Sequence, residues 1–485
     1  MFSNKLIQAF QGLSRKQMTR FYEFVQSPYF NKHGEVKTLV GHFNNLYPRF
    51  LEKTCERKIL FKNVFPDRKH DQKHLALLFT YTWRLLNQFL TQEQFRKSEI
   101  QQNIFLLQSL RKNGSHRNYE KLLSEVETEL VKSEIQNSDF SFQQFLVKSE
   151  AERFHTQLEK HETDWSIQQK QNHLDHFYFS EKLKDACEMM MRSKILQVEY
   201  SYQMLDDIIA EIEKSVEKYE HIPSIIIYYQ VFQMMTKGTS EFYQDLIPIL
   251  KKYESFFPKE ELESIYNHLQ HFCMTKINTG DDNYLNELFQ LYKMQLEADL
   301  LIENNYLSEW HYKNIVTVAL RLDELDWVKK FIEVYRNRLD PEVVENAYTF
   351  NLAAYYYQTE QLERVLDLLV QVEYTDIRYR VHAKSLLLRT YYDLNEYEAF
   401  VSLTESFRQY LQRNNQISTS RRDGFSNLVK FAKKAFQIKN SISISKREKL
   451  QHELDKLLKD IALANTIFNQ SWLNMKVNEL QKEIN

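Results

Sequence analysis

Apolar residues recur at helical spacing between positions 306 and 411, in three successive pairs of segments joined by short polar turns. The apolar positions of the middle pair are Leu352, Ala353 and Tyr356, followed by Leu362, Val365 and Leu369. Val328, Val365 and Phe400 occupy equivalent places in the three pairs, 37 and then 35 residues apart. Spacings of three and four residues predict helices with one apolar face. Each pair of segments is therefore predicted to form a helix hairpin.

This period, with small or apolar residues where two helices cross closely, resembles the tetratricopeptide repeat. The repeat family often has glycine at one position of the first helix, and the three pairs of this chain have Val316, Ala353 and Leu388 there. The resemblance covers about a fifth of the chain. It implies an all-α fold, a right-handed α-solenoid of helix hairpins with helical caps at both ends. Stacked repeats of this kind serve many functions, so the resemblance does not name one.

In proteins that resemble this repeat, the first helix of each pair lines a concave groove. Carried over one position at a time, the groove residues of this chain are Lys313, Thr317, Arg321, Phe350, Tyr357, Gln358, Ser385, Arg389, Tyr392 and Asp393. Basic groups beside tyrosines suit an acidic protein or peptide, because Lys and Arg make charge-assisted hydrogen bonds and Tyr offers rigid contact area. A solvated face without a ligand is the alternative. The resemblance thus implies a non-catalytic scaffold or adaptor.

The rest of the chain is also predicted to be helical. Gly and Pro number only 7 each among 485 residues, so turns that need a special backbone angle are scarce. Residues 1–98 lack the repeat and predict short helices around positions 6–10, 18–25, 36–46 and 73–89, the last with Trp83 facing inward. They form either a bundle that caps the solenoid or a basic module like a helix-turn-helix.

Four parts follow from these patterns. We expect a basic helical N-terminal module at 1–98, irregular helical hairpins at 99–220, tetratricopeptide-like repeats at 221–411, and a basic C-terminal helical cap at 412–485. The cap is predicted to hold a final helix on Leu450, Leu454 and Leu457, with Trp472 covering the remaining apolar surface.

Charge is unevenly distributed, although the net charge is only −2. Residues 1–75 carry a balance of +8 and residues 413–485 a balance of +7, which leaves −17 for the middle. Basic ends could contact nucleic acid, associate with the acidic middle of another copy, or be solvated. The candidates for phosphate contact, interleaved with Phe425 and Phe431, are Arg421, Arg422, Lys430, Lys433 and Lys434. Nucleic-acid binding through the ends is therefore the alternative function, and the oligomeric state stays open.

Catalytic and cofactor motifs are missing from the sequence. It contains no phosphate-binding glycine loop, nucleophile elbow, zinc-protease motif or dinucleotide fingerprint, so we expect no enzyme and no cofactor. Histidine pairs such as His268 and His271 supply two metal ligands where a stable site needs three or four, so no metal is expected. The three cysteines are far apart, and no long apolar run or signal peptide is visible, which predicts a cytoplasmic protein without a membrane anchor.

Overall fold

The structure is a computed structural model that describes residues 4–158, 166–370, 376–414 and 416–484. Within these residues the chain forms 25 α-helices, two short 3-10 helices and one two-stranded hairpin, β1 (Ile302–Glu303) with β2 (Tyr306–Leu307). The all-α class expected from the scarcity of Gly and Pro is confirmed. The chain divides into two compact units, one made of residues 1–186 and 202–228, the other of residues 187–201 and 229–485.

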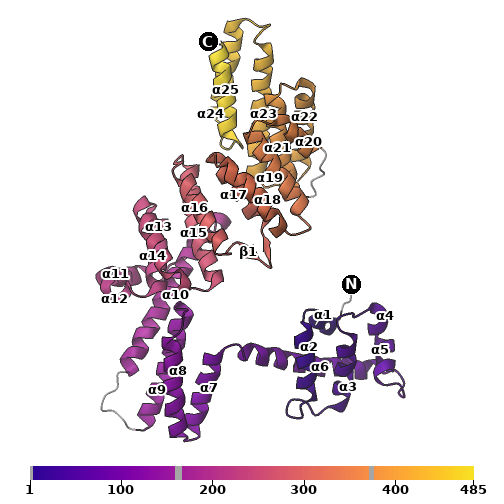
Figure 1. Ribbon diagram of the computed structural model, residues 1–485, viewed down its shortest axis with the longest axis vertical. Helices are drawn as coiled ribbons and strands as arrows, with labels where there is room; N and C mark the ends of the chain where they lie inside the picture. Colours follow the sequence, from indigo (N-terminus) through magenta and orange to yellow (C-terminus); the bar gives the residue numbers. More distant parts are fainter. Residues whose placement is uncertain (1–3, 159–165, 371–375, 415, 485) are drawn as a thin grey trace. The chain divides into compact units, whose positions relative to one another are not determined.

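The first unit begins with a bundle of six helices (Figure 1). These are α1 (Lys5–Gln11), α2 (Arg15–Gln26), α3 (Gly34–Leu46), α4 (Glu52–Cys55), α5 (Arg57–Val64) and α6 (Gln72–Phe95). Phe10 lies at the centre of the bundle, with ring centroids 5.7 Å from Phe21 and 5.2 Å from Phe43. Trp83, expected to face inward from α6, is exposed, and the buried positions near it are Thr82, Leu85 and Leu86.

Further helices of the first unit are α7 (Glu99–Lys112), α8 (His116–Val131), α9 (Ser138–Gln157), α11 (Leu205–Lys214) and α12 (Val216–Tyr219). A buried carboxylate, Glu150, joins α7 to α9 through an ion pair of 2.5 Å with Nε of Arg111. The Tyr119 hydroxyl donates to the backbone carbonyl of Glu150 at 2.9 Å. Polar groups buried this deeply are stabilising only while they keep their partners.

The boundaries between the two units fall within two helices, α10 (Ser166–Leu196) and α13 (Pro223–Lys237). The second unit continues with α14 (Ser240–Tyr253), α15 (Lys259–Asn278) and α16 (Tyr284–Glu297). Three pairs follow: α17 (Glu309–Arg321) with α18 (Leu325–Tyr335), α19 (Val344–Gln358) with α20 (Leu362–Val370), and α21 (Ile377–Asp393) with α22 (Tyr397–Arg413). The chain ends in α23 (Thr419–Ser441), α24 (Arg447–Ala462) and α25 (Gln470–Ile484).

The first helix of each pair ends in the same way. Asp323, Glu360 and Asn395 have φ values of 60°, 58° and 58°, and they follow α17, α19 and α21 at intervals of 37 and 35 residues. In each case the next N–H donates to a carbonyl five residues back, as from Gln361 to Tyr356 at 2.9 Å. This left-handed cap satisfies carbonyls that the helix end leaves without partners.

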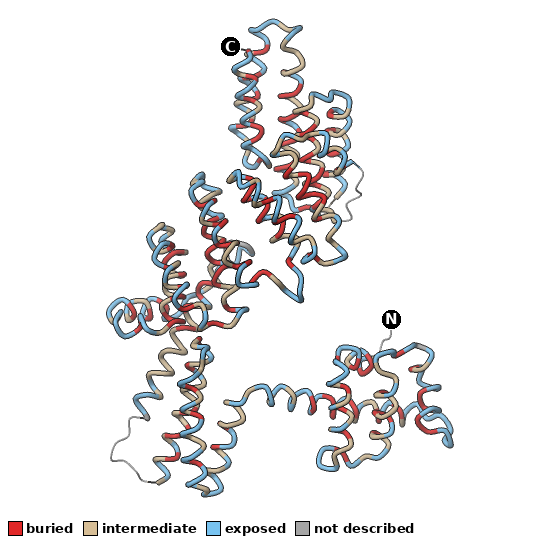
Figure 2. The backbone as a smooth tube through the Cα atoms, viewed as in Figure 1, coloured by how far each residue is buried: buried red, intermediate tan, exposed pale blue. Residues whose placement is uncertain are grey.

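Neighbouring helix pairs stack with their first helices side by side. Helix α17 contacts α19, α19 contacts α21, and α21 contacts α23, while α18, α20 and α22 each contact the first helix of the following pair. Buried residues follow the contacting faces of these helices (Figure 2). The predicted helix hairpins at 306–411 are thus present in the structure.

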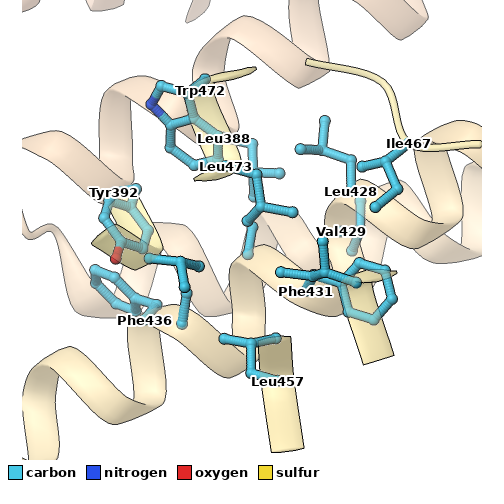
Figure 3. Packing of buried hydrophobic residues seen from close by; sticks show 14 of the residues in the cluster. Leu388, Tyr392, Leu428, Val429, Phe431, Phe436, Leu457, Ile467, Trp472 and Leu473 are labelled. Atoms are coloured by element: carbon cyan, nitrogen blue, oxygen red, sulfur yellow. The ribbon is translucent and has the colours of Figure 1, made fainter. Parts of the chain in front are cut away.

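The C-terminal part contains one helix more than the sequence predicted. Helix α24 buries the expected Leu450, Leu454 and Leu457, and α25 then packs against both α23 and α24. Trp472 lies in α25 and is buried with Leu473 against residues of α21 and α23 (Figure 3). The final core is therefore shared between the last helix pair and a three-helix C-terminal cap.

Candidate functional site

A pocket of about 550 Å³ lies in the second unit, between the first helices of the three pairs and the start of α25. Its cationic lining groups are Lys313 and Arg321 from α17 and Arg389 from α21, and no Asp or Glu side chain lines it. We call it the inner pocket. The remaining lining residues are Thr317, Leu320, Phe350, Ala354, Tyr357, Gln358, His382, Ser385, Leu386, Phe468, Asn469, Gln470, Ser471 and Trp472.

Most residues proposed for the groove lie together in this pocket. Those that line it are Lys313, Thr317, Arg321, Phe350, Tyr357, Gln358, Ser385 and Arg389. They come together because the first helices of consecutive pairs pack side by side, and residues at equivalent helical positions face the same way.

Two of the proposed groove residues do not line the pocket. Tyr392 is buried in the core, with ring centroids 5.3 Å from both Phe436 and Trp472 (Figure 3). Asp393 is partly buried and holds the Nζ of Lys476, from α25, at 3.0 Å. Both positions lie where α25 and α23 cover the end of α21, so they are structural contacts in this arrangement.

Arg389 has an unusual environment for a guanidinium. Its carbon Cζ lies 4.6 Å from the ring centroid of Tyr357, and its Nε is buried without a hydrogen-bond partner. No described residue forms an ion pair with it. The carboxylate of Asp393 acts on Arg389 electrostatically. It also accepts a hydrogen bond of 2.5 Å from the Tyr357 hydroxyl and pairs with Lys476. Burial lowers the pKa of Arg389, although a guanidinium stays charged at any physiological pH.

Lys313 is the second cation of the pocket without a counter-ion. Its ammonium group makes no hydrogen bond or ion pair with a described residue, and the side chain is partly buried. Burial, and after it the positive charge of Arg421, lower the pKa of Lys313 to about 8. Arg421 lies in the first turn of α23 and likewise pairs with no carboxylate among the described residues. Arg321 differs, because it forms an exposed ion pair of 2.9 Å with Asp282.

His382 lies between these cations and is uncharged at neutral pH. Burial first, and then the charges of Lys313, Arg421 and Arg389, lower the pKa of His382 to about 3. Its ring lies 5.6 Å from that of Phe425 and 6.2 Å from that of Phe350. The same histidine lines a second cavity, of about 590 Å³, together with Arg421 and Ser418 at the start of α23. No sequence motif indicated His382, and its role follows only from the packing of α21 against α23.

One wall of the inner pocket comes from the segment that joins α24 to α25. Phe468 stacks on Phe425 at 4.1 Å, and its backbone N–H donates to the carbonyl of Gly424 at 3.2 Å. The Asn469 amide donates to the Ser385 hydroxyl at 2.8 Å, which fixes this segment on α21. No sequence pattern indicated this wall, because residues 84 positions apart form the contact.

The five residues proposed for nucleic-acid contact have different side-chain environments. Arg422 donates from Nη2 to the carbonyls of Asn414 and Ile417, and Lys434 forms an ion pair of 2.5 Å with Asp460. Lys430 lies over the ring of Phe431 at 5.1 Å, and Lys433 is partly buried. Phe425 and Phe431 are both buried, so neither ring is available to stack on a base. Of the five, Arg421 alone lines a cavity described above.

Comparisons with known proteins return nothing for this chain, since no family model, no curated protein and no solved structure matches it. Within the described residues, no helix is both long enough and apolar enough to cross a membrane. Nor do three or more His, Cys, Asp or Glu side chains gather there in a way that could hold a metal ion. The inner pocket offers cations, hydroxyls and aromatic rings, a set suited to binding an anion.

Proposed function

We propose that this protein is a non-catalytic scaffold or adaptor that binds an acidic segment of a partner protein in the inner pocket. The observation that carries the proposal is the lining of that pocket. It presents Lys313 and Arg389, together with Arg321, which is paired with Asp282, and no described Asp or Glu side chain lines it. Cations in a partly buried site attract an acidic chain, since charge-assisted hydrogen bonds gain strength where water is excluded.

The surrounding architecture that we propose is a right-handed α-solenoid of tetratricopeptide-like hairpins. Left-handed caps support this architecture, because they recur at Gly238, Gly280, Asp323, Glu360 and Asn395, the first two with φ values of 64° and 97°. Helix α21 contacts α17 as well as its neighbours, since the ring of Tyr379 stacks on that of Trp310 at 5.2 Å, and a surface held by such packing is formed before the ligand arrives. A pre-formed surface loses little conformational entropy on binding, which favours a scaffold role. The three cysteines are buried free thiols, which suits a reducing cytoplasm.

The proposal can be tested by selecting peptides from a random display library on the immobilised full chain. We expect the selected peptides to be rich in Asp and Glu and to lose binding to the double variant Lys313→Glu with Arg389→Glu. Circular dichroism melts establish whether this variant is folded. Lys313→Gln, which removes one charge from a partly buried site, serves as a milder second variant.

A charge-matched control is available on the same unit. Lys329 in α18 and Lys456 in α24 are exposed and do not line the inner pocket. Changing both to Glu alters the net charge by the same amount as the pocket double variant does. Acidic peptides that bind this control as they bind the unmodified chain support the proposal. Selected peptides without acidic residues, or peptides that still bind the folded pocket variants, would refute it.

A further inference from the structure

The inner pocket contains more uncompensated positive charge than a single carboxylate can neutralise. Lys313 and Arg389 line it, Arg421 acts on Lys313 from the neighbouring cavity, and none of the three forms an ion pair with a described residue. Surface cations usually find carboxylate partners or point into water, and a guanidinium with its Nε buried does neither. Leaving a buried charged donor without a partner destabilises the fold.

Among the described residues, Asp393 is the carboxylate that acts on Arg389, and it is already engaged. Asp393 accepts from the Tyr357 hydroxyl and pairs with Lys476, which itself also contacts Glu479 at 3.1 Å. Burial raises the pKa of Tyr357, so its hydroxyl keeps the proton that it donates. This arrangement holds the Tyr357 ring beneath the guanidinium and leaves Nε of Arg389 without an acceptor among the described residues.

The start of α23 adds a further attraction for negative charge. This helix has 23 residues, its cap residue Ser418 makes no side-chain hydrogen bond to it, and its first turn contains Arg421 and Arg422 but no acidic residue. A helix N-terminus carries partial positive charge and normally favours Asp or Glu nearby. Arg421 adds to the positive potential at His382, which lines both cavities.

We infer that the inner pocket is a site for a phosphate monoester dianion, held by Arg389 and Lys313 with Arg421 nearby. A phosphoryl group carries a charge of about −1.5 to −2 and three acceptor oxygens, so it can satisfy several cations at once where a carboxylate satisfies fewer. A pocket of about 550 Å³ has room for such a group together with part of the side chain that bears it. This inference deepens the proposed function and rests on it for the source of the group, a phosphorylated side chain of the partner.

Isothermal titration of the full chain tests the inference with defined probes. The probes are inorganic phosphate, N-acetyl-phosphoserine amide, N-acetyl-glutamate amide, acetate and adenosine monophosphate. We expect phosphate and the phosphoserine derivative to bind, the glutamate derivative and acetate to bind at least about tenfold more weakly, and salt to weaken all binding. Arg389→Met and Lys313→Met should each weaken phosphate binding by about tenfold or more, which corresponds to loss of one charged hydrogen bond.

A spectroscopic readout separates binding in the pocket from a merely structural role of these residues. His382 lines the pocket and is acted on by the charges of Lys313, Arg389 and Arg421, so a bound dianion should shift its imidazole NMR signals at neutral pH. Arg389→Lys keeps the charge and should retain part of the affinity. The charge control of Lys329 and Lys456 changed to Glu should bind phosphate as the unmodified chain does.

The outcomes distinguish this inference from the proposed function. No phosphate binding, equal binding of acetate and phosphate, or phosphate binding that persists in both methionine variants overturns the inference, while selected acidic peptides could still bind the pocket. Binding of adenosine monophosphate that exceeds that of the phosphoserine derivative keeps the phosphoryl site but contradicts a phosphorylated partner, and with it the proposed function.

Discussion

The guanidinium of Arg389 lies over the ring of Tyr357 at 4.6 Å and has no carboxylate partner among the described residues. A cation over an aromatic ring gains about 0.5–2 kcal/mol, depending on how far it is removed from water. A buried donor without an acceptor loses about 1–3 kcal/mol. The two effects are of similar size, so the contact with Tyr357 offsets the burial of Arg389 without making the site strongly stable.

The first prediction follows from this balance. Arg389→Met keeps the length and apolar contacts of the side chain while removing the unsatisfied donor, so we expect the free energy of unfolding to stay equal or rise by up to about 2 kcal/mol. Chemical denaturation of the unmodified chain and the variant, without added anion, measures this. Phosphate should raise the melting temperature of the unmodified chain only. A clear loss of stability in Arg389→Met would mean that the guanidinium holds the fold together.

The second prediction concerns Lys313, whose pKa is lowered to about 8 in the folded protein by burial and by Arg421. In the unfolded chain the amine has its usual pKa, near 10.4. Between these two values the unfolded state binds more protons, so the stability contribution of this group rises as pH increases from about 8 to about 10. Below pH 8 both states are protonated and the penalty is constant.

Lys313→Met should therefore stabilise the protein at pH 7 and remove this rise with pH. Denaturation at a series of pH values measures the slope for both proteins, with Lys329→Met as the control because that side chain is exposed. The other charged or titratable groups that line the pocket are Arg321, Arg389, His382 and Tyr357, the last with a pKa raised by burial, and Arg421 acts on Lys313 from the neighbouring cavity. A slope that is the same in Lys313→Met and the unmodified chain would contradict the prediction.

A third prediction concerns the buried ion pair of the first unit. Arg111→Met leaves the Glu150 carboxylate, which is only 1% exposed, with Arg153 at 3.5 Å as its remaining cation. We expect a loss of about 3 kcal/mol, since an uncompensated buried charge costs more than the pair contributes. The double variant Arg111→Met with Glu150→Met should recover most of the loss. A double-mutant cycle by denaturation measures the coupling, and additive losses would argue against a direct pair.

The repeat could be predicted from the sequence because its apolar positions keep their period, although its helix caps lack the glycine that usually marks them. Val328, Val365 and Phe400 are all fully buried, as their equivalence requires. The left-handed caps, however, hold Asp323, Glu360 and Asn395, and only Asn is a common alternative to glycine at this backbone angle. A search for glycine after each helix would have missed all three hairpins. Tertiary packing imposes the left-handed backbone angle, and the residue type at that position depends on it only weakly.

Only the site residues that share a face of the first helices could be predicted from the sequence. Lys313, Tyr357 and Arg389 all come from first helices of consecutive pairs, although they occupy different places in the repeat, since Lys313 corresponds to Phe350 and Arg389 to Thr317. Tyr392 and Asp393 lie one turn beyond Arg389, where α25 covers α21, and a local pattern contains no information about a helix that returns from 80 residues later. The Asp393 carboxylate forms its ion pair with Lys476 and not with Arg389, so the charge of the pocket also depends on this distant contact.

The fourth prediction concerns the wall of the pocket at Gly424. This glycine lies inside α23, where replacement by alanine ordinarily stabilises a helix by about 0.5–1 kcal/mol. A β-carbon at this position would lie 2.5 Å from Cδ2 of Phe468 and 3.2 Å from Cγ2 of Thr466. Gly424→Ala must therefore displace the Phe468 ring from Phe425, and we expect it to destabilise the protein by about 1–3 kcal/mol.

Gly34→Ala provides the matched control, because Gly34 is also helical and a β-carbon there meets nothing within 4 Å. It should raise the free energy of unfolding by a few tenths to about 1 kcal/mol. If Gly424→Ala is stabilising to the same extent as Gly34→Ala, then the segment joining α24 to α25 does not rest on α23, and the inner pocket lacks that wall. Hydrogen exchange at the Phe468 amide, which donates to the Gly424 carbonyl, reports the displacement directly.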